Sequence, residues 1–379
     1  METKESKGVA ISFAAIDPYI QKAIPSPVEK KTSHGWVEWG ERNAFPNYLL
    51  ELRKTTPTLR SIIGGTVDFV TGDDITILPL PSTAYQPGVM NTRGDTIRGQ
   101  VHDIGFDILT YGGFAFQVVR SYTGNVVEVY YVDLRFIRCN KENSVFYYSE
   151  EWEKSTRKVV EYPAFYPFTP ESWAALEPKE RERHASSILY VKNESSQVYP
   201  FPVYGAALKD CETERSIADF HLNAIENSFT SSMVINFNNG APSDEIRKEI
   251  ERSVNEKFSG HQNAGRIVIS WNSDAAHRTT FDTPKVEDFG ARYDALSKWC
   301  RQQLFTAFRA NPNLFGIPTE SLGFSQEEYE SAFRLYNRTC VRPMQTLICD
   351  AYDRIYGVPG VLTIKPFSLA ETQAEKNVQ

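Results

Sequence analysis

The sequence lacks the patterns that disulfide frameworks and zinc sites require. Its five cysteines are odd in number, lie far apart and form no Cys-x-x-Cys pair, so neither a disulfide scaffold nor a thiolate metal site is indicated. No stretch approaches the ~18 consecutive apolar residues that span a bilayer, and the N-terminus lacks the basic start and apolar run of a secretory signal. We therefore expect a soluble protein that is made in a reducing cytoplasm.

Motifs of nucleotide-dependent and hydrolytic enzymes are also absent. The sequence contains no GxxxxGKS/T, GxGxxG, HExxH or GxSxG. Asp73 and Asp74 are candidate metal-binding carboxylates, although such a pair more often forms a solvated turn. His221 has no candidate nucleophile beside it in the sequence. These absences predict a protein that is not an enzyme and that uses no cofactor or metal.

Positive charge is scarce. The formal net charge is -7, whereas tight nucleic-acid binding depends on many Lys and Arg contacts with phosphates. The aromatic cluster from Trp36 to Tyr48 would need more basic neighbours to stack on bases, so we expect it to anchor the first domain. Any contact with DNA is therefore expected to be loose or local.

The first half of the chain is predicted to be mostly β-structure after an early helix at residues 46–70. Apolar residues alternate in 114–118 and again in 127–131, on either side of Gly124 and Asn125, which predicts a β-hairpin. A Pro-rich aromatic loop is expected at 162–178. Further short strands are expected at residues 146–148, 158–162 and 188–191.

The next part of the chain predicts two amphipathic helices around a small αβ unit. Apolar residues at spacings of three and four predict helices at 205–231 and 286–309, the second about 36 Å long. Strands are expected at 233–237 and 266–271. The helix between these strands has an apolar face of Ile246, Ile250, Val254 and Phe258.

A loop and a last helix complete the predicted order. The loop at 310–324 contains prolines and glycines, and Ser325 with Glu328 forms a capping box for the helix that follows. Pro343 should kink this helix, and Gly357 should end it.

This order of elements and several short stretches of sequence resemble the portal proteins of tailed bacteriophages. Residues 257–266 are similar to the family's helix end and Asn-Ala-Gly turn, and 304–318 to its passage from a long helix into a Pro-containing loop. Residues 109–115 resemble its helix-to-strand junction. The resemblance covers roughly residues 35–356 and is carried by diffuse patterns, not by one diagnostic motif.

The resemblance implies an α+β, multidomain, portal-like fold with an α/β wing, paired stem helices and a small αβ clip. The wing would comprise residues 1–204 and 325–367. The stem helices would comprise residues 205–232 and 284–309, and the clip residues 233–283. The channel loop would comprise residues 310–324, and a polar tail residues 368–379.

The resemblance also implies a homo-oligomeric ring of about twelve copies in the virion, assembled in the host cytoplasm, through which double-stranded DNA passes without sequence preference. The implied partners are the terminase large subunit, a head-tail adaptor, and the major capsid and scaffold proteins, with no membrane.

Two groups of residues are candidates for these roles. The candidate DNA-channel residues, whose cations fit a solvated helix face equally well, are Arg292, Lys298, Arg301, Arg309, Asn311 and Asn313. The candidate docking surface of the clip consists of Glu245, Lys248, Glu249, Arg252 and Glu256.

Two alternatives from other classes stay open. A metal-dependent nucleic-acid processing enzyme would cleave DNA in the presence of metal and would lose this activity in Asp73→Ala or Asp74→Ala. Another minor head or neck protein of the virion would be a monomer or a small assembly instead of a large ring.

Overall fold

The computed structural model describes residues 29–32, 34–78, 88–154, 158–193, 197–226, 233–237, 243, 245–246, 248–250, 252, 267–271, 289–317 and 326–368. The chain forms two compact units. Unit 1 holds residues 1–51, 67–202 and 342–379, and unit 2 holds residues 52–66 and 203–341. Both units contain helices and strands, which confirms the predicted α+β class.

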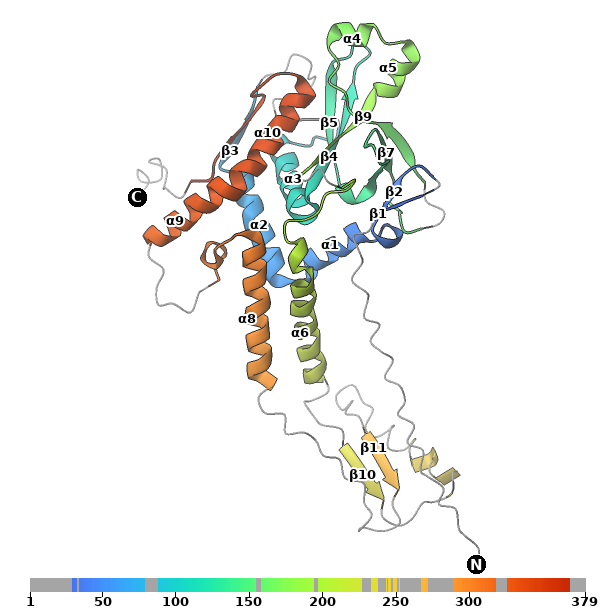
Figure 1. Cartoon of the computed structure of the whole chain (residues 1–379), viewed down its shortest axis with the longest axis vertical. Coiled ribbons are helices and arrows are strands. Elements are labelled where there is room, and N and C mark those ends of the chain that lie inside the picture. The colour runs from blue at the N-terminus through green and yellow to red at the C-terminus, as the bar shows by residue number, and fades with distance from the viewer. Residues whose placement is uncertain are drawn as a thin grey trace, which may run out of the picture. The chain divides into compact units, whose positions relative to one another are not determined.

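The centre of unit 1 is a three-stranded antiparallel sheet in the order β5-β4-β9, formed by Val126–Val132, Gly113–Arg120 and Ser186–Lys192. The hairpin of β4 and β5 is the one that the alternation predicts. Two helices contact this sheet, α3 (Ile97–Tyr111) and α10 (Arg342–Tyr356) (Figure 1).

A buried chain of hydrogen bonds joins these helices to the sheet. The hydroxyl of Tyr352 in α10 donates to Oε1 of Gln100 in α3 at 2.7 Å, and Nε2 of Gln100 donates to the carbonyl of Val129 in β5 at 2.7 Å. The ring of Tyr352 also meets Phe116 of β4 edge to face. Because each buried polar group has a partner, the contact fixes both helices without an unsatisfied donor or acceptor.

The other sheets of unit 1 are small and antiparallel. The pairs are β1 (Glu29–Lys31) with β2 (Val37–Trp39) and β3 (Asp74–Ile77) with β12 (Leu362–Lys365), and the triplet is β6-β7-β8 (Ile137–Cys139, Val145–Tyr148 and Val160–Pro163). The strands predicted near residues 146 and 160 are confirmed by β7 and β8, and the strand predicted near residue 188 is confirmed by β9 of the central sheet.

Two predictions of the first half need correction, and one helix was predicted only at its end. The single helix predicted at 46–70 is two helices, α1 (Phe45–Thr55) and α2 (Pro57–Thr71), because Pro57 disfavours helical backbone at the residue before it. The segment predicted as loop at 162–178 contains α4 (Pro170–Ala174), and α5 (Pro178–His184) follows. The end of α3 agrees with the helix-to-strand junction expected at residues 109–115, whereas its start, which the Thr96 side chain caps, was not predicted.

Gly112, which ends α3, stands where a larger residue would not fit. Its backbone is left-handed, with φ of 92°, and a methyl group there would overlap the carbonyl oxygen of Phe201. We expect Gly112→Ala to lower the free energy of unfolding by roughly 2–4 kcal/mol, because it adds a steric clash to left-handed strain. Thermal denaturation measures this loss. The control is Gly94→Ala, since Gly94 has φ of 82° but open space around it; equal losses in the two variants would contradict the clash.

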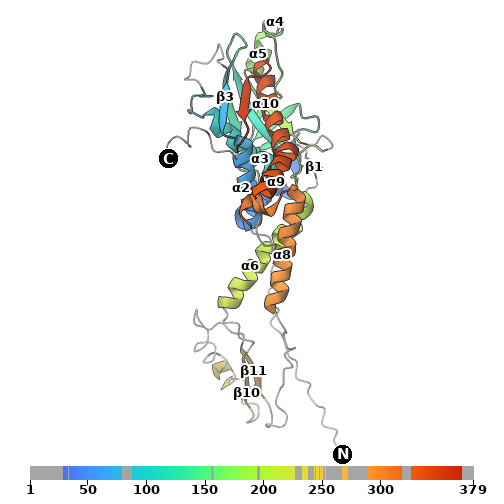
Figure 2. The ribbon, with the colours of Figure 1, turned by 90° about the vertical axis from the view of Figure 1, so that its left-hand side faces the viewer.

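Unit 2 contains two long helices, α6 (Leu208–Glu226) and α8 (Phe289–Phe308), which lie side by side. Figure 2 shows that they cross at an angle. Strands β10 (Met233–Phe237) and β11 (Ile267–Trp271) pair in parallel, and the rings of Phe237 and Trp271 stack with centroids 4.5 Å apart. The predicted helices and strands of this part are confirmed within the described residues.

The last long helix changes its hydrogen-bond pattern where the kink is predicted. Helix α9 (Gln326–Tyr336) is followed by a π-helical turn, Asn337–Val341, directly before α10. Pro343 has no N–H for the carbonyl of Thr339, which favours such an irregularity. The predicted end is confirmed, since α10 stops at Tyr356 and Gly357 is left-handed. The cap predicted at Ser325 lies outside the described residues. Helix α9 belongs to unit 2, whereas α10 belongs to unit 1.

Candidate functional site

The paired helices of unit 2 pack through only part of their apolar faces. Cys211 of α6 and the α8 residues Cys300 and Leu304 are buried. Farther along, Phe220 of α6 stacks on Tyr293 of α8 with ring centroids 4.7 Å apart. These contacts bury part of the apolar face that the sequence predicts for each helix.

Two apolar residues in the second half of α6 are exposed. Ala218 is exposed, and Leu222 retains 57% of its accessible surface. Leu222 follows Phe220 by two residues and therefore lies about 160° around the axis from the ring that contacts α8. We call Ala218 and Leu222 the α6 patch.

Helix α8 carries a second exposed apolar surface. Leu296 is exposed and Trp299 retains 57% of its accessible surface. These two residues are three apart and share one face of the helix; we call them the α8 patch. The pair of helices thus presents two separate apolar patches, one on each helix.

The candidate positions on α8 do not all share a face, and the side chain of Arg292 lies outside what the structure describes. Lys298 and Arg301 lie about 60° apart around the axis, whereas the register puts position 292 about 120° from Lys298. Lys298 is exposed and pairs with Asp294 at 3.2 Å. Arg301 is half-buried, and Arg309 is exposed in left-handed backbone after the helix, with φ of 52°. The structure therefore brings Lys298 and Arg301 together and places position 292 elsewhere.

The two candidate asparagines lie at a short turn after α8, η5 (Pro312–Phe315). Oδ1 of Asn311 accepts a hydrogen bond from the backbone N–H of Asn313 at 3.0 Å and so caps the turn. Both asparagines are half-buried. Asn311 therefore has a structural role, and the role of either residue at DNA stays a prediction.

Most of the candidate docking residues of the clip are exposed. Glu245, Lys248, Glu249 and Arg252 lie on the surface, and Glu256 lies outside the described residues. Ile246, which was expected on the buried face of this helix, is also exposed. Val254 and Phe258 lie outside the described residues, so the predicted face is tested only in part.

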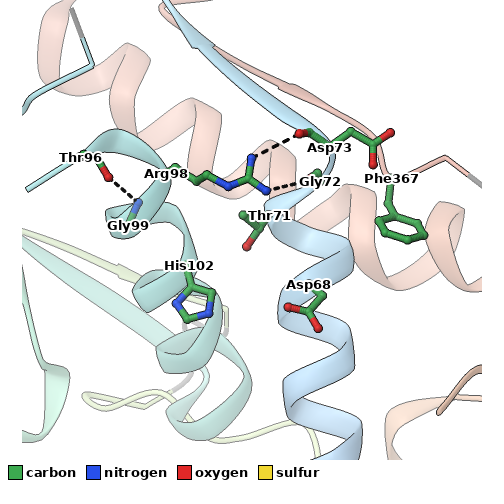
Figure 3. A pocket seen from close by; sticks show the side chains of 9 residues that line it. All are labelled: Asp68, Thr71, Gly72, Asp73, Thr96, Arg98, Gly99, His102 and Phe367. Carbon is green, nitrogen blue, oxygen red and sulfur yellow. Dashed lines mark hydrogen bonds between the residues drawn. The ribbon is translucent and has the colours of Figure 1, made fainter. Parts of the chain in front are cut away.

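The carboxylates considered for a metal site bind backbone groups instead. In a pocket of about 550 Å³ (Figure 3), Arg98 donates to the carbonyls of Gly72 and Asp73 at 3.1 and 3.3 Å. Asp73 accepts from the N–H of Ser368, and Asp74 from that of Ile75. Among the described residues no group of three or more His, Cys, Asp or Glu side chains is placed to hold a metal ion, so the metal-dependent alternative gains no support from this pair.

The aromatic cluster near the start of the chain is buried, which confirms its anchoring role. Trp36, Trp39, Phe45 and Tyr48 are all in the core of unit 1, so their rings are not available for stacking on bases.

Sequence reasoning missed Arg138 of β6, which lies against this cluster. The side chain is 1% exposed and donates to Oδ1 and the carbonyl of Asn43 and to the carbonyls of Arg135 and Ile137. The rings of Trp39 and Trp152 lie beside the guanidinium. Burial lowers the pKa of Arg138 to about 10, which leaves it charged at neutral pH.

The arrangement of elements is similar to that of proteins from the necks of gene transfer agent (GTA) particles. One belongs to the neck of a native particle computed with C12 symmetry, with 15% identity, a TM-score of 0.52, and 88% of this chain and 87% of that chain covered. Another belongs to the neck of an empty particle computed with C6 symmetry, with 14% identity, a TM-score of 0.51, and coverages of 87% and 86%. At such identities the likeness shows the fold. None of the curated proteins compared matches the chain.

The family follows from the sequence match. Residues 96–366 match the phage portal protein family, and this match covers well over half of the chain. The chain therefore belongs to the phage portal protein family, which is a family of structural proteins. None of the described helices is long and apolar enough to cross a membrane.

Proposed function

We propose that copies of the chain form a ring of about twelve subunits around a channel for double-stranded DNA. The observation that carries this proposal is the presence of two separate exposed patches on the paired helices. A closed ring of identical subunits needs a contact in which one surface of each copy meets a different surface of the next. The α6 patch and the α8 patch provide such a pair, because they lie on different helices and are both apolar.

The charge of the chain suits DNA that must slide. With a net charge of -7 and with Lys298 paired to Asp294, the helix offers few phosphate contacts, and each contact would add to salt-dependent binding. Lys298 and Arg301, which share a face, are the cations that we place nearest the DNA, with Arg309, Asn311 and Asn313 at the end of α8. Packaging and ejection both require DNA that is held weakly and moves along the channel.

The clip is proposed as the docking site for other components. Glu245, Lys248, Glu249 and Arg252 are exposed and of mixed sign, which favours polar contacts that form and separate. The terminase large subunit would dock there during packaging, and the head-tail adaptor afterwards. Contacts with capsid and scaffold proteins would place the ring at a vertex of the virion, after assembly in the host cytoplasm.

The oligomeric state of the purified chain tests this function. We expect native mass spectrometry to give a single species of about twelve copies, and negative-stain microscopy to show rings with a central hole. Recombinant rings of slightly different number would fit the same contact geometry. A stable monomer at micromolar concentration would instead favour another minor head or neck protein.

A further inference from the structure

The ring of Phe315 occupies a socket within unit 2. Phe315 is the last residue of η5, and its ring lies 5.9 Å from the ring of Phe305 in α8 and 5.9 Å, edge to face, from that of Tyr336 in α9. Gly65 of α2 forms the third side. A methyl group at Gly65 would lie 2.8 Å from Cδ1 of Phe315, so the ring sits where only a glycine leaves space.

The socket is held together beside this glycine. The hydroxyls of Thr66 and Tyr336 form a hydrogen bond of 2.7 Å, and both residues are buried. Burial raises the pKa of Tyr336, so its hydroxyl stays protonated and can serve as donor. This bond fixes the orientation of the Tyr336 ring against the ring of Phe315.

The π-helical turn also affects the direction in which the Tyr336 ring points. Tyr336 and Val341 are both buried, although they are five positions apart in the sequence. In an α-helix they would lie about 140° apart, whereas i→i+5 bonding brings them to the same side. The irregular turn therefore lets Tyr336 face the socket while Val341 remains in the core.

The backbone bends sharply on both sides of Phe315. Arg309 is a non-glycine residue with φ of 52°, and Gly316 has φ of 72°. Hydrogen bonds from the N–H of Ala310 to the carbonyl of Phe305, and from that of Ile317 to that of Pro312, close the two bends. Left-handed backbone at a residue such as Arg309 persists only where surrounding contacts enforce it.

From these contacts we infer that Phe315 is a positioning residue, a latch that holds residues 309–317 in the socket of Gly65, Phe305 and Tyr336. Removal of the ring would loosen both bends, because it removes the contacts of this segment with Gly65 of α2 and Tyr336 of α9. The consequence for DNA passage rests on the proposed function, since it assumes that the loop starting here lines the channel. The latch itself does not depend on that assumption.

Hydrogen exchange of the assembled full chain tests the latch. In Phe315→Ala we expect the amides of Ala310 and Ile317 to exchange at least about tenfold faster than in the unaltered protein. The control is Leu335→Ala, in which a 65% exposed side chain beside Tyr336 is shortened and exchange should not change. Exchange in Phe315→Ala within about twofold of the unaltered protein would overturn the proposal.

A second set of variants decides the matter even if Phe315→Ala does not fold. Gly65→Ala should expel the ring, and Phe315→Leu should leave a gap, so each should speed exchange at Ile317. The double variant should exchange more slowly than either single variant, because the added methyl group fills part of the space that the smaller side chain leaves. A double variant that is no slower than the single ones would refute the socket.

DNA packaging separates the latch from its proposed consequence. If both are correct, Phe315→Leu forms intact rings with faster exchange at Ile317 but packages less DNA. Fast exchange with normal packaging would keep the latch and remove the channel role of this loop. Slow exchange with impaired packaging would overturn the latch and leave the proposed function in place.

Discussion

Trp299→Glu is expected to break the ring into monomers and short open fragments. Trp299 is the more exposed of the two residues of the α8 patch, and tryptophan is enriched among residues that dominate binding energy at interfaces. A carboxylate at this position would lose the apolar contact and would have to be buried without a partner. We expect association between neighbours to weaken at least about 100-fold, or about 2.7 kcal/mol per contact, as measured by native mass spectrometry and analytical ultracentrifugation.

The control for this variant is Val160→Glu. Val160 lies on β8 of unit 1 and is 50% exposed, so the same kind of change there should leave the ring intact. An undiminished ring population in Trp299→Glu, with normal thermal unfolding, would show that the α8 patch is not the contact between copies.

Mixing two variants tests the pairing of the patches directly. Leu222→Glu should also abolish rings, because it alters the α6 patch. Trp299→Glu retains a normal α6 patch and Leu222→Glu a normal α8 patch, so the two variants can form one unaltered contact. The mixture should therefore give heterodimers but no rings. If each patch instead met the same patch on another copy, the mixture would give no heterodimers.

Local patterns in the sequence were enough to predict most elements but not what covers them. Alternation predicts the hairpin of β4 and β5, since each strand buries one face against the core. The seam of α6 is equally apolar at Cys211 and at Leu222, yet only Cys211 is buried within the chain. Periodicity is the same for a face covered by the chain's own fold and for one left for a partner.

Sites that depend on distant residues could not be predicted. Spacing placed the candidate cations on one helix, but only the helical register separates position 292 from Lys298 and Arg301. The partners of Phe315 come from α2, α8 and α9, which no local pattern connects. Arg138 has its partner Asn43 at a distance of 95 residues in the chain, and a single arginine in a short strand gives no signal of burial.

Arg138→Met is expected to cost roughly 3–5 kcal/mol of the stability of unit 1. The methionine fills much of the same space but leaves the carbonyls of Asn43, Arg135 and Ile137 without their donor, and each buried unsatisfied group costs about 1–3 kcal/mol. It also removes the cation between the rings of Trp39 and Trp152. The loss should appear in thermal unfolding followed by tryptophan fluorescence, because these two rings adjoin the altered site.

Two further variants separate the shape of the side chain from its charge. Arg138→Lys keeps the charge but cannot reach the same carbonyls with a planar fork, so most of the loss should remain. Arg135→Met removes a half-exposed cation paired with Asp133 at 2.7 Å and should cost under about 1 kcal/mol. If Arg138→Met unfolds at the same temperature as Arg135→Met, the buried guanidinium does not stabilise unit 1 through Asn43. A separation of several degrees at equal protein concentration would show that it does.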